Sequence, residues 1–210
     1  MFDFNDKIVM ITGAAGGIGT SLVDVFTLMG AHVVACCHSE INAPVATDNV
    51  DVLIYDVTSH DEVRNAIKLI KTKYGKIDVA INNAGILVDS LLGMLTNEML
   101  ERVLDTNALS TIVHMRDQSR VMLQKKQGVI INIASIVGID GNVGQVAYSA
   151  SKAAVIAATR SLAREVASNG LRVNAIAPGL VDTPMLRSVT QCKLDQLLSK
   201  TPMNRFAMPI

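Results

Sequence analysis

The chain lacks an excess of charge of either sign, and this absence removes one large class of partners. It carries 19 basic and 19 acidic residues among 210. Proteins that bind nucleic acid or an anionic membrane surface concentrate basic residues, which a balanced composition does not favour. We therefore expect a small molecule as the partner, and neither nucleic acid nor a membrane.

Long hydrophobic runs and a basic leader are also missing. Gly, Asn or charged residues interrupt the apolar runs well before the roughly 18 residues that a transmembrane helix needs. Residues 1–6 include two acids and no base, so they do not read as a secretory signal. No membrane segment is expected.

Cysteine is scarce, and histidine is scattered. Two of the three cysteines, Cys36 and Cys37, are adjacent, which argues against a disulfide framework and favours the reducing cytoplasm. The four histidines lie far apart without the spacing of metal ligands, and we expect no metal site. They are His32, His38, His60 and His114.

What is present is the pattern of a globular α/β protein. Half of the residues are hydrophobic, and 210 residues suffice for one domain with a large core. Short β-branched runs alternate with longer helical stretches, as in βαβ units. Strands are expected at 8–11, 32–36, 52–55, 78–81, 129–133 and 172–176, and helices at 17–29, 60–74, 97–126, 147–168 and 190–199. We predict a Rossmann-like, doubly wound parallel sheet in a single domain, 1–210. The connection around Pro44 is short, so its crossover helix should be short or irregular.

Residues 12–19, Thr-Gly-Ala-Ala-Gly-Gly-Ile-Gly, form a glycine-rich turn directly after the first expected strand. Its glycines allow a tight turn, a close approach of the backbone to a diphosphate and close helix packing, and the helix N-terminus offers free N–H groups. A purely structural turn would also explain the glycines, but the position between strand and helix favours a dinucleotide. The predicted contacts are Gly13, Ala15, Gly16, Gly17, Ile18 and Gly19.

The end of the second expected strand bears on the type of dinucleotide. No Asp or Glu stands there to accept from a ribose 2′-hydroxyl, and His38 and Ser39 could donate to a 2′-phosphate. No Arg or Lys is present here, or at Ala15 or Gly16, to provide a firm counter-charge. NADP is therefore favoured over NAD by only a small margin. His38 could also be an ordinary surface loop residue.

Tyr148 and Lys152 stand four residues apart in an expected helix, which places both side chains on one face. An ammonium beside a phenol favours the phenolate and lowers a tyrosine pKa that is ordinarily near 10. Most such pairs on helices are solvated neighbours, so the pair alone is weak evidence. Its meaning depends on the other motifs.

Taken together, the motifs resemble those of the short-chain dehydrogenase/reductase family. They are the glycine-rich turn, Asn82-Asn83-Ala84-Gly85 after the fourth expected strand, Ser135 after the fifth, and Tyr148 with Lys152. Within the family, residues 141–145 and 162–168 are most similar to 3-oxoacyl-[acyl-carrier-protein] reductases. The resemblance implies an NAD(P)-dependent oxidoreductase that reduces a ketone of a small carbonyl compound or acyl thioester. It also implies a homo-oligomer, a dimer or tetramer, if the C-terminal unit of the family is present.

The resemblance assigns roles to four residues. Tyr148 would be the general acid in ketone reduction and the base in alcohol oxidation, a kind of step worth about 10²–10⁴ in rate. Lys152 would lower the phenol pKa and bond the nicotinamide ribose, and Ser135 would donate to the carbonyl oxygen. Asn107 would hold a proton-relay water near the lysine, or be only a polar residue on a helix flank.

The resemblance also implies cofactor contacts from loops that follow other strands. These loops leave the carboxyl ends of parallel strands, where open α/β sheets hold ligands. Asn83 could instead be purely structural. The implied contacts are Asp56 and Val57 at the adenine, Asn83, Ala84 and Gly85 beside the adenine ribose, and Pro178, Gly179, Val181 and Thr183 at the carboxamide.

The chain departs from the family pattern near its end. Relatives continue beyond Ile210 through another helix and a seventh strand, so we expect that last helix and strand to be missing and the sixth strand to be an edge. Residues 184–204 would be the substrate loop. Their Met and Leu side chains suit an acyl chain, or merely pack on the core.

Two other functions stay open. One is an NAD-dependent dehydrogenase of a sugar, polyol or hydroxy acid, because the same residues catalyse the reaction in both directions. The other is a non-catalytic dinucleotide-binding protein. The joint presence of Ser135, Tyr148 and Lys152 speaks against the latter, since cofactor binding alone does not need the serine.

Overall fold

The computed structural model describes residues 3–187, 194, 198–199 and 201–209. Within them, six parallel strands form one sheet in the order β3-β2-β1-β4-β5-β6. The strands are β1 (Ile8–Thr12), β2 (His32–Cys37), β3 (Val50–Ile54), β4 (Val79–Asn82), β5 (Gly128–Ile133) and β6 (Leu171–Ile176). The predicted α/β fold with a doubly wound parallel sheet is confirmed, and each predicted strand agrees with the observed one to within two residues.

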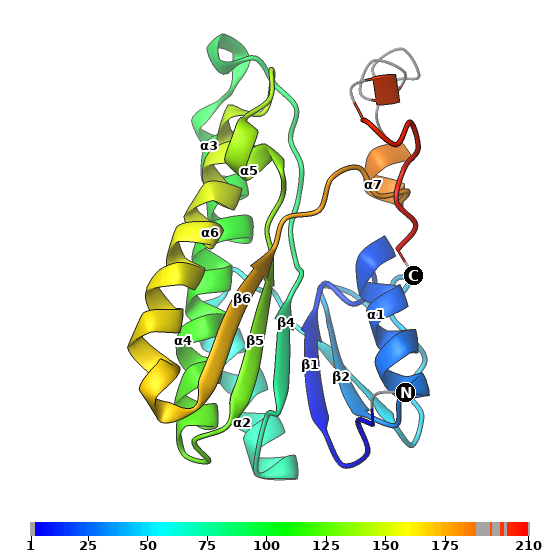
Figure 1. Cartoon of the computed structure of the whole chain (residues 1–210), viewed down its shortest axis with the longest axis vertical. Helices are drawn as coiled ribbons and strands as arrows, with labels where there is room; N and C mark the ends of the chain where they lie inside the picture. Colours follow the sequence, from blue (N-terminus) through cyan, green and yellow to red (C-terminus); the bar gives the residue numbers. More distant parts are fainter. Residues whose placement is uncertain (1–2, 188–193, 195–197, 200, 210) are drawn as a thin grey trace.

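Helices cover both faces of the sheet. Figure 1 shows α2, α4 and α6 on one side and α1 on the other. The described helices are α1 (Gly17–Leu28), α2 (His60–Tyr74), α3 (Asn97–Leu104), α4 (Ser110–Leu123), α5 (Val137–Asp140), α6 (Val146–Val166) and α7 (Pro184–Arg187). A π-helical turn η2 (Asp105–Leu109) joins α3 to α4, and η1 (Leu92–Met94) and η3 (Ala167–Asn169) are 3₁₀ turns.

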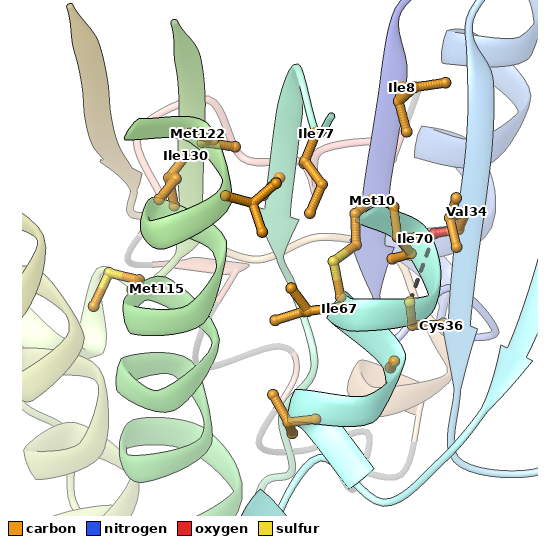
Figure 2. Close-up of a cluster of buried hydrophobic side chains, with 14 of the residues drawn as sticks. Ile8, Met10, Val34, Cys36, Ile67, Ile70, Ile77, Met115, Met122 and Ile130 are labelled. Atoms are coloured by element: carbon orange, nitrogen blue, oxygen red, sulfur yellow. Dashed lines mark hydrogen bonds between the residues drawn. The ribbon is translucent and has the colours of Figure 1, made fainter. Parts of the chain in front are cut away.

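The strands are buried on both faces because their apolar residues alternate between two cores. Ile8 and Met10 of β1 belong to the core under α2, α4 and α6, which Figure 2 shows in close-up. Val9 and Ile11 belong to the core on the opposite face, where α1 packs. All five residues of β1 are buried, which explains why this strand is a continuous apolar run in the sequence.

The strand order places the switch point of the sheet between β1 and β4. From this pair the chain progresses outward in one direction to β2 and β3 and in the other to β5 and β6. The loops that follow β1 and β4 therefore diverge at the carboxyl edge of the sheet and leave a crevice there. This is the position in which a ligand site is expected.

The long helix expected at 97–126 is not continuous, which corrects the prediction. The π-helical turn η2 interrupts it, and α4 ends at Leu123. Two side-chain hydroxyl groups donate hydrogen bonds to backbone carbonyl groups of this wider turn. Ser110 Oγ donates to Thr106 O at 2.5 Å, and Thr111 Oγ1 donates to Asn107 O at 2.8 Å. Single-turn π bulges of this kind are frequent at functional sites.

Two further connections bear on the predicted elements. Residues 38–49, between β2 and β3, contain no helix, in agreement with the irregular crossover expected around Pro44. The helix expected at 190–199 lies mostly outside the described residues. The short helix α7 was not predicted, and after it the chain returns to pair Ala207 with Val181.

His114 of α4 is buried and holds a hydrogen bond at each ring nitrogen. Nδ1 lies 2.8 Å from Ser110 O and Nε2 lies 2.9 Å from the Tyr55 hydroxyl. A carbonyl only accepts, so Nδ1 carries the proton and Nε2 accepts from Tyr55. Burial lowers the pKa of His114 to about 4, against the opposing influence of Ser110 O and Asp117.

We predict that His114 makes the fold less stable in mild acid. In the unfolded chain its pKa is ordinary, near 6.5, so the unfolded state binds the extra proton first as the pH falls. This group therefore removes up to about 3 kcal/mol of unfolding free energy between pH 6.5 and pH 4. Urea unfolding of His114→Gln across this range should give a flatter pH dependence, whereas His60→Gln, at an exposed site, should not. Equal slopes in all three proteins would contradict the prediction.

Candidate active site

A cleft of about 1130 Å³ opens at the carboxyl edge of the sheet. Its volume exceeds the roughly 300–1,000 Å³ of a typical small-ligand pocket, which leaves room for a dinucleotide together with a second molecule. All predicted site residues except Gly19 and Asn107 line it. They are Gly13, Ala15, Gly16, Gly17, Ile18, His38, Asp56, Val57, Asn83, Ala84, Gly85, Ser135, Tyr148, Lys152, Pro178, Gly179, Val181 and Thr183.

The glycine-rich turn is shaped as a cradle at one part of this cleft. Gly13 has φ +65°, and a Cβ there would come within 2.8 Å of Ala84 Cα. A Cβ on Gly17 would come within 2.7 Å of Thr183 Cγ2, so this glycine keeps the turn and the Thr183 loop close together. The first turn of α1 contains no acidic side chain. Its N–H groups and helix dipole therefore face the cleft unneutralised and suit a diphosphate.

Gly19 has a packing role. A Cβ at this position would lie 2.1 Å from Gly13 O. Only glycine lets α1 approach its own preceding turn so closely, which is the third use predicted for the glycines of this motif. Gly19 itself is buried and does not line the cleft.

Asn83 ties the loop after β4 to the glycine-rich turn. Its Nδ2 donates to Thr12 O at 3.1 Å and to Gly13 O at 3.0 Å. The Thr12 hydroxyl in turn accepts from the backbone N–H groups of Asn83 and Ala84. The Asn83 side chain is thus used to hold two loops together, which is the structural alternative that the sequence left open.

His38 and Asp56 lie near each other at the ends of β2 and β3. His38 is exposed, and its charge acts on Asp56. Burial raises the pKa of the Asp56 carboxyl, but hydrogen bonds from Thr58 and the influence of His38 outweigh it, so the pKa lies below its ordinary value. The Asp56 carboxylate accepts from Thr58 N and Oγ1, each at 2.8 Å. This end of the cleft therefore holds one histidine and one ionised carboxylate.

Ser135, Tyr148 and Lys152 meet in the same cleft from two elements. Ser135 follows β5, and the other two lie one turn apart on α6. The Lys152 ammonium is 5.8 Å from the centre of the Tyr148 ring and donates to Ile133 O at 2.8 Å. A Cβ on Gly85 would lie 3.2 Å from Asn107 Oδ1, a tighter approach than most side chains make.

The pKa of Tyr148 differs from the sequence expectation. Burial raises it, and the Ser135 hydroxyl acts in the opposite direction. The sequence led us to expect that Lys152 lowers it, but the lysine ammonium is turned to the Ile133 carbonyl. Lys152 is itself buried, and burial lowers its pKa to about 8. The pair is therefore a partly buried phenol beside a buried, readily deprotonated amine.

Asn107 lies outside the cleft lining, in η2, and its side chain is fully engaged. Its Nδ2 donates to Ile86 O at 2.9 Å and Ser151 Oγ at 3.1 Å, and its Oδ1 accepts from Ile86 N at 2.8 Å. These bonds hold the segment after Gly85 against α6, next to Lys152. The role of Asn107 in holding a relay water stays a prediction.

A buried network of amides joins β4 and β5 directly beneath the site. Asn82 Nδ2 donates to Asn132 Oδ1 at 2.8 Å and to Gln118 Oε1 at 3.0 Å, and Gln118 Nε2 returns a bond to Asn82 Oδ1 at 2.9 Å. Asn132 Nδ2 donates to Thr159 Oγ1 at 2.8 Å. All four side chains are buried. Asn82 immediately precedes the Asn83 loop, so the network fixes the strand ends that carry the site.

Several cleft residues were missed by the sequence reasoning. Cys36 and Cys37 line the cleft, although the sequence used them only to argue against disulfides. Gln145 and Asp89 also line it. Gln145 lies in the segment that resembles the family and stands three residues before Tyr148, which is the only signal that could have identified it. Asp89 carries no such signal.

Neither a membrane span nor a metal cluster is found in the part of the chain that the structure describes. No helix there combines the length and apolarity needed to cross a bilayer. Likewise, no group of three or more His, Cys, Asp and Glu side chains in the described ranges could hold a metal ion.

We predict that Lys152 makes the fold less stable. At pH 7 the folded protein holds the charged ammonium of Lys152 in a buried position. Burial of this charge is unfavourable, and for that reason the pKa falls from 10.5 to about 8. Lys152→Met should raise the unfolding free energy at pH 7 by about 2 kcal/mol, after allowance for the bond lost at Ile133 O. It should also remove the gain in stability that the parent shows as the pH rises from 8 to 10.5. Urea unfolding tests this, with the exposed Lys125→Met as the control; a destabilised Lys152→Met protein would contradict it.

The chain is similar to known proteins over most of its length. A model of the short chain dehydrogenase family matches residues 7–193. The 3-oxoacyl-[acyl-carrier-protein] reductase FabG of Thermotoga maritima is 37% identical over 210 residues, covering 97% of this chain and 85% of that protein. The reductase of the same name from Escherichia coli is 36% identical over 207 residues, with the same coverage.

A solved structure shows the same fold. The crystal structure of gox2181 matches with a TM-score of 0.94 and 30% identity, covering 99% of this chain and 85% of that one. The chain is accordingly an oxidoreductase that acts on CH–OH and C=O groups with a nicotinamide dinucleotide. The family model and the identity to these relatives establish that it belongs to the short-chain dehydrogenase family.

Proposed function

We propose that this chain reduces the ketone of a 3-oxoacyl thioester, with NADPH as the preferred cofactor. The observation that carries the proposal is the meeting of Ser135, Tyr148 and Lys152 in one cleft with the glycine-rich turn. The 3-oxoacyl-[acyl-carrier-protein] reductases among the relatives support the substrate class. Apolar side chains in the cleft lining favour an acyl chain over a polyol; they include Ile86, Leu87, Ile136, Leu180 and Leu186.

The residues of the cleft fit the cofactor. The unneutralised N-terminus of α1 would hold the diphosphate, and Asp56 with Val57 would contact the adenine. The loop that carries Val181 and Thr183 would meet the carboxamide. Its backbone is fixed by Ala207, which donates to Leu180 O and accepts from Asp182 N, each at 2.9 Å. When bound, the nicotinamide supplies the hydride.

The chain's own residues handle the proton. The Ser135 hydroxyl would donate to the ketone oxygen and hold the carbonyl polarised. Tyr148 would give its phenolic proton to that oxygen as negative charge develops, so that no bare alkoxide forms. A protonated Lys152 would stabilise the phenolate that remains. Lys152 is buried and Tyr148 is partly buried, and the reduced access of water strengthens this charge interaction.

Replacing Tyr148 with Phe tests the acid. The variant keeps the ring but lacks the proton, and turnover should fall by about 10²–10⁴. Its affinity for NADPH, measured by fluorescence titration, should stay within about tenfold of the parent, because the hydroxyl adds at most one hydrogen bond to the cofactor. Turnover near the parental value would overturn the proposed role.

A panel of substrates tests the function as a whole. Oxidation of NADPH and NADH should be measured side by side with an acetoacetyl thioester, a simple ketone and a keto-sugar. The proposal expects the thioester with NADPH to give the highest kcat/KM. The highest kcat/KM with the keto-sugar and NADH would favour a sugar or polyol dehydrogenase. Tight NADPH binding without oxidation in any assay would favour a non-catalytic binding protein.

His38 should account for the small preference for NADP. As the donor placed to meet a 2′-phosphate, its removal in His38→Ala should weaken NADPH binding about three- to tenfold and leave NADH within about twofold. The dissociation constants can be measured by fluorescence, with the exposed His60→Ala as the control. A parent that binds NADH more tightly than NADPH would refute the assignment.

A homo-oligomeric state and a cytoplasmic location stay predictions of the sequence.

A further inference from the structure

Gln145 is a buried polar residue of the cleft that the chemistry above does not use. It is the N-cap of α6, and Tyr148 stands three residues later on the same helix. Both side chains line the cleft. Gln145 has non-helical backbone angles (φ −127°, ψ 31°), so it lies at the very start of the helical turn that carries the proposed acid.

The orientation of this amide is fixed by its partners. Its Nε2 donates to Asp89 Oδ1 at 2.7 Å, and its Oε1 accepts from Asn142 Nδ2 at 3.0 Å. A carboxylate only accepts, so the NH₂ group must face Asp89. Among the residues that the structure describes, these are the side-chain bonds that Gln145 makes. One of its two amide hydrogens is left for a ligand.

The surrounding backbone holds the amide in place. Ser90 N donates to Gly144 O at 2.8 Å, so the segment after β4 and the segment before α6 are joined at two points. Gln145 N also bonds Asn142 O at 3.2 Å. We refer to residues 89–90 and 141–145 as the Gln145 wall. The Gln145 wall thus adds the Gln145 amide, a polar donor, to a cleft whose lining also contains apolar side chains such as Ile86 and Leu87.

We propose that Gln145 Nε2 donates its second hydrogen to the thioester carbonyl of the substrate while Ser135 and Tyr148 engage the ketone. This inference rests on the proposed function and specifies how the substrate class is recognised. In a 3-oxoacyl thioester one carbon separates the two carbonyl groups, so a donor at the start of α6 would meet one oxygen while Tyr148 meets the other. Asp89 acts through Gln145 as a positioning residue.

Such a donor discriminates against simple ketones. A substrate without the second carbonyl leaves the buried N–H without a partner, and an unmet buried donor is costly. Sites built to hydrogen-bond a substrate group reject analogues that lack it more strongly than apolar pockets reject a missing methylene. Gln145 therefore selects a 1,3-dicarbonyl pattern, which the tyrosine, lysine and serine cannot do.

The test compares two substrates that differ in the second carbonyl. We expect Gln145→Met, which keeps length and loses the donor, to lower kcat/KM for an acetoacetyl thioester about tenfold, chiefly through KM. For a methyl ketone of equal chain length, kcat/KM should not fall, because the variant removes the donor that this ketone leaves unmet. Gln124→Met, at the exposed C-cap of α4, should change neither. An equal loss on both substrates, or no loss on either, would overturn the inference.

Asp89 provides a second arm that does not alter Gln145. Asp89→Asn keeps a carbonyl oxygen for Gln145 Nε2 and should retain most of the selectivity ratio, whereas Asp89→Leu should lose it. This pair decides the question if Gln145→Met fails to fold, and equal ratios in the two Asp89 variants would count against the inference. A parent enzyme that reduces no acetoacetyl thioester would overturn the proposed function itself. A parent that reduces it while the ratios never change overturns only the role of Gln145.

Discussion

The register of β4 against β5, held by buried amides, is the constraint on which the site depends. Asn82 and Asn132 are directly paired residues of the two strands, and their side chains bond each other within the core. Gln118 and Thr159 complete the set from α4 and α6. Losing one partner would leave others buried and unsatisfied, at a cost of about 1–3 kcal/mol each. A shift by one residue would turn these amides to the opposite face of the sheet, so the network permits a single alignment of the strand ends that bear the reactive loops.

Because the strand ends are held in one alignment, the site can contain features that are unfavourable for stability, such as a buried lysine. Lys152 loses solvation on burial, and the Ile133 carbonyl at the end of β5 compensates only in part. The π-helical turn η2 is a second example, because it interrupts an otherwise continuous helix and presents Asn107 to Ile86 and Ser151. The strands below and the π-helical turn beside it hold the amine in position. A buried charge supported by a satisfied core beneath it is what a preorganised site requires.

The sequence was sufficient for the sheet and for the elements of the site that are local. Continuous apolar runs located the strands, and the glycine-rich turn was recognisable because strand, turn and helix are consecutive. The π-helical turn could not be predicted, since its hydrogen bonds depend on Ser110 and Thr111, residues that also occur in regular helices. The Asp89–Gln145 bond joins residues 56 positions apart, and no local pattern encodes it. The raised pKa of Tyr148 likewise depends on burial and on where the lysine points, which spacing alone did not reveal.

Different elements of the fold carry the separate tasks of the site. The turn after β1 and the ends of β2 and β3 hold the groups suited to the dinucleotide, whereas Ser135 and α6 hold those suited to the proton. The Gln145 wall belongs to neither set and connects the loop after β4 to the start of α6. Because these groups would contact different parts of the ligands, changes in one should affect the others mainly through shared strand ends. In the proposed mechanism the Tyr148–Lys152 pair handles the proton, and we expect recognition of the substrate to depend on residues outside it. The separation gives a physical reason why one reactive arrangement can serve many carbonyl compounds in a shared fold.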